Sequence, residues 1–194
     1  MLQENPAFRF VALLEQRARA DNQWREQEYS VGSSLFEPMQ DEGVVCVLRA
    51  GLVKLYYPVE NGEEWTKSFI ADRGVFGPSA PDERIVRFGA RAIERTVVAK
   101  LPPRWVSDCL AQFAELSTAF ADFQAWLFAR KREREEDLLC LSAEERYLKL
   151  VRSEANLMAR LEQQEIAAYL RITPVALSRI RRRLKGEGRL SPTA

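Results

Sequence analysis

Near its C-terminus the chain reads Gln163-Gln-Glu-Ile-Ala-Ala-Tyr-Leu170, then Arg171-Ile-Thr-Pro174, then Val175-Ala-Leu-Ser-Arg-Ile-Arg-Arg-Arg-Leu184. The first segment carries apolar residues at helical spacing, which predicts a short helix with one buried face. Threonine is a favoured N-cap residue and proline suits the first helical position, so a second helix is predicted to begin at Pro174. Two short helices joined by a tight turn are typical of a helix-turn-helix.

The second predicted helix has one apolar side and one basic side. Leu177, Ile180 and Leu184 recur at spacings of three and four residues, which predicts that they face a core. The arginines between them are left facing outward, where arginine can bind guanine edges and phosphates in the major groove of DNA. A plain helical hairpin with a solvated basic face is the alternative, but the combined N-cap, proline and apolar spacing favours DNA binding.

The charge of the chain is unevenly distributed. From Arg160 to the C-terminus eight lysine and arginine residues stand against three acidic residues, whereas the whole chain of 194 residues has a net charge of +1. This distribution predicts a polyanionic partner for the C-terminal end only.

The composition excludes several kinds of site. The chain has no histidine, so metal sites with histidine ligands and serine–histidine or cysteine–histidine catalytic pairs are excluded. Cys46, Cys109 and Cys140 form no CxxC motif and are too few for an iron–sulfur cluster. We therefore predict no metal site and no cofactor. Scattered cysteines, no membrane-length apolar run and no signal peptide lead us to expect a cytoplasmic protein without membrane association.

The N-terminal part of the chain predicts a helix followed by a β domain. Residues 6–21 have apolar residues at helical spacing, and from about Gln27 short β-like runs alternate with turn residues. The main runs are residues 44–48, 52–57, 65–70, 74–78, 84–93 and 95–101. Asn61-Gly62 predicts a hairpin because both residues tolerate positive φ. Many short strands without intervening helices favour an antiparallel sandwich or barrel.

A long helix is predicted after Pro102-Pro103. Leu116, Phe120, Phe123 and Leu127 lie at spacings of four, three and four residues, which is typical of a coiled-coil seam. Because Trp126 and Phe128 form a second apolar strip, this helix needs cover on two sides. We interpret the seam as a homodimer interface, and the alternative is one wide core face within a single chain.

Charged residues indicate how the chain continues beyond this seam. Arg130–Asp137 alternates in sign, with Lys131 and Glu135 four residues apart, so a solvated helix face is favoured over a nucleic-acid site. Ser142-Ala-Glu-Glu145 is a capping box, which predicts that a new helix begins there. The predicted fold is α+β, with a jelly-roll-like antiparallel β-roll and N-terminal helix over residues 1–113. A dimerisation helix over residues 114–141 and an all-α helix-turn-helix domain over residues 142–194 follow.

Over nearly the whole chain, this order of elements resembles a Crp/Fnr-family transcriptional regulator. Ile166–Leu170, Ile172–Pro174, Leu177–Arg181 and the capped helix from Ser142 to Leu150 carry the resemblance. It implies a homodimer that binds a near-palindromic site in double-stranded DNA, with RNA polymerase as a further partner. It also implies that Arg179 reads bases and that Gln164 contacts phosphate. The implied DNA-binding residues are Gln164, Thr173, Ala176, Ser178, Arg179, Arg182 and Arg183.

Three features depart from the family pattern. Val175 stands where the family has a glutamate and Pro174 where it often has an arginine, so we do not expect the common family half-site. Arg171 replaces a turn glycine, which costs about 1 kcal/mol if this residue is left-handed. We expect no wing hairpin between Arg152 and Gln163, where the apolar spacing predicts a short helix instead.

The β-roll is predicted to be degenerate for cyclic nucleotides. Family members that bind them carry Phe-Gly-Glu and, later, an Arg-Ser or Arg-Thr pair, whereas this chain has Phe76-Gly77-Pro78-Ser79 and then Val86-Arg87. Because the ribose acceptor is missing and the arginine is displaced, we do not expect cyclic-AMP binding. Candidate pocket residues for another small anion are Gly77, Ser79, Arg87 and Arg91, and exposed strand arginines are the alternative.

Two other classes of function compete with a DNA-binding regulator. An enzyme on the β domain is disfavoured because barrel oxygenases and isomerases generally need histidine ligands, and no GxSxG, SxxK or complete phosphate loop is present. A ligand-binding or adaptor module that no longer binds DNA is the main alternative, since Arg171, Pro174 and Val175 depart from the family pattern.

Overall fold

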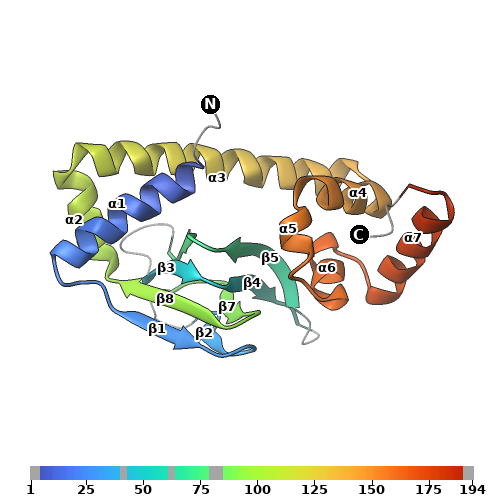
Figure 1. Cartoon of the computed structure of the whole chain (residues 1–194), viewed down its shortest axis with the longest axis horizontal. Coiled ribbons are helices and arrows are strands. Elements are labelled where there is room, and N and C mark those ends of the chain that lie inside the picture. The colour runs from blue at the N-terminus through green and yellow to red at the C-terminus, as the bar shows by residue number, and fades with distance from the viewer. Residues whose placement is uncertain (1–4, 40–42, 61–63, 79–84, 190–194) are drawn as a thin grey trace. The chain divides into compact units, whose positions relative to one another are not determined.

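The computed structural model describes residues 5–39, 43–60, 64–78 and 85–189 (Figure 1). The chain forms two compact units: unit 1 comprises Met1–Pro58 and Lys67–Ala129, and unit 2 comprises Val59–Thr66 and Arg130–Ala194. The sequence predicts a division at residue 142, whereas these units divide the long helix α3 (Ala114–Cys140) after Ala129.

The elements follow one another in the predicted order of helix, strands, long helix and C-terminal helices. Besides the first half of α3, unit 1 contains α1 (Pro6–Ala20), β1 (Glu26–Tyr29), β2 (Ser34–Phe36), β3 (Val45–Ala50), β4 (Leu52–Pro58), β6 (Val75–Phe76), β7 (Gly89–Ala92), β8 (Thr96–Leu101) and α2 (Pro103–Gln112). Strand β5 (Glu64–Ala71) begins in unit 2 and continues in unit 1. Unit 2 also contains α4 (Ala143–Ser153), α5 (Ala155–Met158), α6 (Gln163–Leu170) and α7 (Pro174–Gly186). The predicted α+β class is confirmed.

The strands form two four-stranded antiparallel sheets. Sheet A has the order β1-β8-β3-β6 and sheet B the order β2-β7-β4-β5. Strands β4 and β5, on either side of the predicted hairpin, are neighbours in sheet B, and Asn61-Gly62 itself lies outside the described residues. Gly51 links β3 to β4 with φ of 106°, and a Cβ atom there would lie 2.7 Å from the carbonyl oxygen of Arg95. Only glycine fits such a turn without strain.

One hydrophobic core lies between the two sheets. Alternate residues of β3 and β4 point into it, as the two-residue period of a strand requires. Sheet A contributes Cys46, Leu48 and Val98 to this core, and sheet B contributes Val53, Leu55, Ala90 and Ala92. The residues of β3 and β4 that lie between these core residues point away from this core.

A second core covers the outer face of sheet A. Val47, Ala99 and Leu101 from the sheet pack with α1, α2 and the first half of α3. Phe10 of α1 is the centre of an aromatic cluster, since its ring centroid lies 5.1 Å from that of Phe120 and 5.5 Å from that of Phe123. Sheet A is therefore buried on both faces.

The four residues predicted as a dimer seam lie in this second core. Leu116 and Phe123 are only 3% and 8% exposed, and Phe120 and Leu127 pack partly buried against the same cluster. The seam prediction is wrong for these residues, because α1 supplies the apolar surface that a partner helix was expected to supply. The alternative, a wide core face within the chain, describes them correctly. On α3 the exposed apolar side chains are instead Phe128 and Leu139, 69% and 79% exposed.

Among the described residues, no helix combines the length and the apolar character that crossing a membrane requires.

The aromatic cluster makes a testable prediction about stability. Phe10→Ala should lower the free energy of unfolding by about 3–5 kcal/mol, because it removes a fully buried ring and leaves a cavity. The matched control is Phe8→Ala on the same helix, where the side chain is 40% exposed; its loss should stay below about 1 kcal/mol. Urea unfolding followed by circular dichroism measures both values, and equal losses would contradict the assigned core.

Candidate nucleic-acid interface

Helices α6 and α7 form the helix-turn-helix that the sequence predicts. The hydroxyl of Thr173 accepts a hydrogen bond from the amide of Ala176 at 3.2 Å, and Pro174 is the first residue of α7. Leu177, Ile180 and Leu184 are buried against residues of α4 and α6, in the core of unit 2. The N-cap and the apolar side of α7 are thereby confirmed.

The turn between the two helices contains a left-handed arginine. Arg171 has φ of 60° and ψ of 43°. Its amide donates to the carbonyl of Ala168 at 3.2 Å, and the amide of Ile172 donates to the carbonyl of Ala167 at 3.0 Å. These two bonds make a Schellman motif, which normally has glycine at the left-handed position. Arg171 is thus left-handed, which is the condition under which replacing the turn glycine costs about 1 kcal/mol.

Two arginines from other helices satisfy the last carbonyls of α6. Arg134 of α3 donates to the carbonyl of Tyr169 at 2.9 Å, and Arg146 of α4 donates to the carbonyl of Leu170 at 3.0 Å. These carbonyls have no partner within their own helix, and the helix dipole makes cations favourable there. Burial lowers the pKa of Arg134, but an arginine remains charged at neutral pH.

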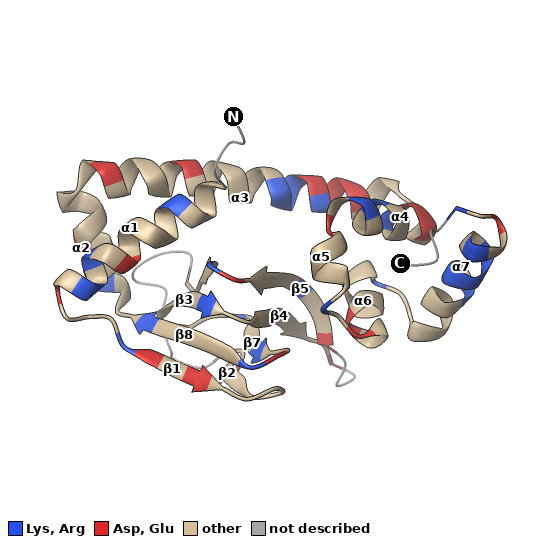
Figure 2. Ribbon diagram, viewed as in Figure 1, with Lys and Arg blue, Asp and Glu red and all other residues tan. Residues whose placement is uncertain are grey.

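The outer face of α7 is basic and exposed to solvent (Figure 2). Arg179 and Arg182 are exposed, and within the part of the chain that the structure describes neither forms an ion pair. Ser178 and Thr173 are also exposed, whereas Ala176 is half-buried. Five of the seven residues predicted to bind DNA therefore lie on one element. They are Thr173, which is the N-cap of α7, and Ala176, Ser178, Arg179 and Arg182 of α7 itself.

The other two predicted residues are held by carboxylates. The guanidinium of Arg183 pairs with Glu144 of α4, and Arg189 pairs with the same carboxylate at 2.7 Å. The side-chain amide of Gln164 donates to the carboxylate of Glu162 at 3.0 Å. A DNA phosphate bound at this position would compete with Glu144 for the guanidinium of Arg183.

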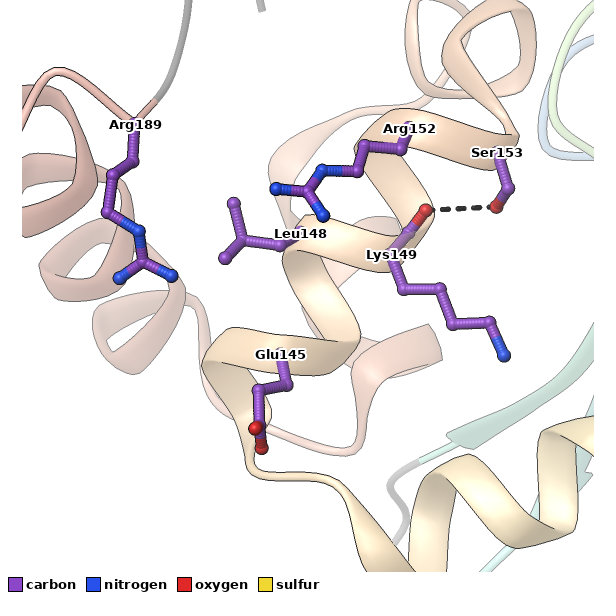
Figure 3. Close-up of a pocket in the computed structure, with 6 residues that line it drawn as sticks. All are labelled: Glu145, Leu148, Lys149, Arg152, Ser153 and Arg189. Atoms are coloured by element: carbon purple, nitrogen blue, oxygen red, sulfur yellow. Dashed lines mark hydrogen bonds between the residues drawn. The ribbon is translucent and has the colours of Figure 1, made fainter.

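A shallow groove runs beside α4 in the same unit (Figure 3). It is lined by Glu145, Leu148, Lys149, Arg152, Ser153 and Arg189. Lys149 is bonded to Asp137 at 2.8 Å and Arg189 to Glu144, so Arg152 is the one lining cation without an ion pair among the residues described. The groove therefore adds basic character beside α7 but presents few groups that are not already paired.

Sequence reasoning missed the residues that brace this motif. The capping box at Ser142 is confirmed, with Glu145 bonding back to the Ser142 amide at 2.8 Å. However, no local pattern could have paired Glu144 with Arg183 or Arg134 with Tyr169, because these partners are about 35 or more residues apart.

The predicted short helix in place of a wing is confirmed as α5, and residues 152–163 are all described and contain no strand.

Three of the four predicted pocket residues of the β-roll, Gly77, Arg87 and Arg91, lie among the described residues. Ser79 lies outside the described residues, and Arg87 is exposed. Arg91 donates to the hydroxyl of Tyr56 at 3.2 Å and stacks on its ring, and that hydroxyl donates to the carboxylate of Glu37 at 2.8 Å. Hydrogen bonds from Ser34 and Tyr56 lower the pKa of Glu37, with Arg91 adding to the effect.

Gly77 has a structural reason for being glycine. Its φ is 152°, and a Cβ atom there would lie 2.6 Å from the carbonyl oxygen of Val44. The residue thus allows two backbone segments to approach closely. Of the two arginines, Arg87 matches the alternative of an exposed arginine, whereas Arg91 is half-buried and engaged by Tyr56.

The described residues contain no cluster of histidine, cysteine, aspartate or glutamate that could hold a metal ion. The three cysteines are free thiols; Cys46 and Cys109 are buried and Cys140 is exposed. Burial raises the pKa of the Cys109 thiol, which disfavours the reactive thiolate.

Several solved structures share this architecture. FixK2 from Bradyrhizobium japonicum matches with a TM-score of 0.77 at 18% identity, covering 88% of this chain and 89% of that one. A CooA mutant from Carboxydothermus hydrogenoformans matches with a TM-score of 0.75 at 21% identity, covering 88% and 80%. The regulator CLP of Xanthomonas campestris gives a TM-score of 0.75 at 14% identity, covering 90% and 93%. No protein-family model and no curated protein sequence matches the chain.

The fold is that of the Crp/Fnr regulators. The resemblance seen in the sequence is thereby confirmed for the arrangement of elements, in which a β-roll, a long helix and a C-terminal helix-turn-helix occur in the predicted order. Within this Crp/Fnr-type fold, α7 occupies the place of the second helix of the helix-turn-helix.

The pairing of Glu144 makes a prediction about pH. Hydrogen bonds from Arg183 lower the pKa of Glu144, and Arg189 adds to the effect. Because the folded pKa lies below the unfolded one, the stabilisation is present above the unfolded pKa and is lost as pH falls through the folded value. The melting temperature of the unaltered chain should therefore exceed that of Glu144→Gln at neutral pH, and the two should converge between about pH 5 and pH 3.

The matched control is Glu136→Gln, since Glu136 is an exposed carboxylate of α3. Its melting temperature should follow that of the unaltered chain over the same range of pH. A constant gap between the unaltered chain and Glu144→Gln would show that the ion pairs do not stabilise the fold.

Proposed function

We propose that this protein is a homodimeric DNA-binding transcriptional regulator of the Crp/Fnr type. The observation that carries the proposal is the exposed basic face of α7, on which Arg179 and Arg182 are not engaged by carboxylates of the described residues. Guanidinium groups on one helix suit the major groove, where arginine binds the O6 and N7 atoms of guanine and further arginines bind phosphates. Thr173, Ala176 and Ser178 lie at the start of the same helix and would contact the adjacent backbone and bases.

The homodimer is supported by two large apolar side chains of α3 that the chain leaves exposed, Phe128 and Leu139. They lie eleven residues apart, about three turns of the helix. We place the dimer contact at these two side chains instead of the buried Leu116–Leu127 seam. A twofold dimer would bind half-sites about 34 Å apart, in a near-palindromic operator.

We infer that the β-roll does not require cyclic AMP. The chain lacks the family's glutamate after Phe76-Gly77, and Arg91 is engaged by Tyr56. Effectors also differ among proteins of this fold, since CLP is described as a c-di-GMP responsive regulator. We propose no cofactor and no catalytic activity, and we place the protein in the cytoplasm with DNA and RNA polymerase as its partners.

A second candidate is an adaptor that keeps the fold without binding DNA. Val175 presents an exposed apolar side chain at the start of α7, and Arg183 is held by Glu144. Both features reduce the polar groups that α7 offers to DNA. Selection from a random-sequence duplex pool, followed by fluorescence anisotropy with and without cyclic AMP, separates the two candidates. A regulator enriches a near-palindrome, whereas an adaptor enriches nothing.

Arg179→Ala should weaken binding to the selected duplex by about 1–3 kcal/mol and relax the preference at one base position. The reason is that a bidentate arginine–guanine pair contributes both affinity and discrimination. The control is Arg132→Ala, an exposed arginine of α3 outside the helix-turn-helix. Anisotropy titrations against selected and scrambled duplexes measure both quantities, and an unchanged preference in Arg179→Ala would contradict its role.

Phe128→Asp should convert the dimer to a monomer, because it places a charge at the proposed apolar contact of α3. Sedimentation equilibrium measures the mass directly. Phe8→Asp is the control, since Phe8 is an exposed phenylalanine of α1; that variant should remain a dimer. A dimer that survives Phe128→Asp would place the contact elsewhere.

A further inference from the structure

The turn of the helix-turn-helix rests on a strand residue far away in the sequence. The guanidinium carbon of Arg171 lies 4.2 Å from the centre of the Trp65 ring. Trp65 is the second residue of β5 and belongs to unit 2 together with the helix-turn-helix. A guanidinium at this distance over an indole face makes a favourable cation–π contact.

A second contact ties the same strand segment to the end of α6. The guanidinium of Arg134 lies 3.7 Å from the centre of the Tyr169 ring and donates to the Tyr169 carbonyl. The same nitrogen also donates to the carbonyl of Thr66 at 3.3 Å. Trp65 and Thr66 are adjacent residues of β5. Trp65 contacts Arg171 of the turn directly, and Thr66 is linked through Arg134 to Tyr169 in the last turn of α6.

These contacts bear on the direction of α7. Arg171 holds a left-handed backbone that favours glycine, so the turn needs support from outside itself. Helix α7 begins at Pro174, only three residues after Arg171. A shift of the turn therefore changes where the side chains of α7 point.

We propose that Trp65 is a positioning residue for DNA recognition: by stacking on Arg171, it fixes the turn that orients α7. The proposal rests on the proposed DNA-binding function. It makes a residue of strand β5 contribute to DNA affinity without contacting DNA.

The test is a double-mutant cycle read out by anisotropy on the selected duplex. Trp65→Ala and Arg171→Gly each remove the stack, and glycine keeps the left-handed backbone accessible. Each single variant should bind about three- to tenfold more weakly than the unaltered chain. The double variant should bind no more weakly than either single variant, because both remove the same contact. Trp65→Phe keeps an aromatic face and should restore most of the affinity.

The matched control is Trp24→Ala, which removes another arginine–tryptophan stack. There the Arg19 guanidinium lies 5.0 Å from the ring centre, within unit 1. Its affinity for DNA should equal that of the unaltered chain, and circular dichroism confirms that each variant is folded. If Trp65→Ala does not fold, the comparison of Trp65→Phe with Arg171→Gly decides the question.

These measurements distinguish failure of the proposed DNA-binding function from failure of the positioning role of Trp65. If the unaltered chain binds no duplex selectively, the proposed function fails and the positioning role fails with it. If the unaltered chain binds selectively but Trp65→Ala does not weaken binding, or its effect multiplies with that of Arg171→Gly, the positioning role alone is overturned.

Discussion

The carbonyl groups of Tyr169 and Leu170, at the end of α6, have no partners in their own helix. The packing of the helices in unit 2 depends on the side chains that supply those partners. Arg134 from α3 and Arg146 from α4 donate to the carbonyls of Tyr169 and Leu170. Both guanidinium groups lie where the helix dipole is negative, so each bond is charge-assisted. Three helices therefore meet at one point of the chain. The turn that leads into α7 begins at that point, and the exposed arginines of α7 depend on it for their placement.

Charge also connects the second half of α3 to α4. Lys149 of α4 lies 2.6 Å from the carboxylate of Glu133 and 2.8 Å from that of Asp137, and Arg130 pairs with Glu154 at 2.6 Å. Exposed ion pairs contribute little individually, but here they join α3 to the same helix at several places. This explains why the compact units divide α3 after Ala129. The charged run 130–137 is thus a solvated face that also braces a domain, and neither property requires nucleic acid.

In unit 1, the corresponding constraint is that sheet A must be covered on both faces. Sheet B covers one face through side chains such as Val53 and Leu55, and helices α1, α2 and α3 cover the other. Phe10 of α1 packs against the apolar side of the first half of α3. In sheet B the polar residues Tyr56 and Arg91 point away from the core and bind each other.

The sequence by itself determined the features that depend on neighbouring residues. These include the capping box at Ser142, the N-cap at Thr173, the alternation of the strands and the order of elements that resembles the Crp/Fnr regulators. Each of them arises from interactions within a few residues or from the order of such segments. Only the tertiary structure decided whether the apolar seam of α3 meets a partner or α1, since a helical pattern records that a face is apolar but not what covers it. The same holds for Arg183 and Arg134: their partners lie on other elements, and only the packing of those elements brings them within reach.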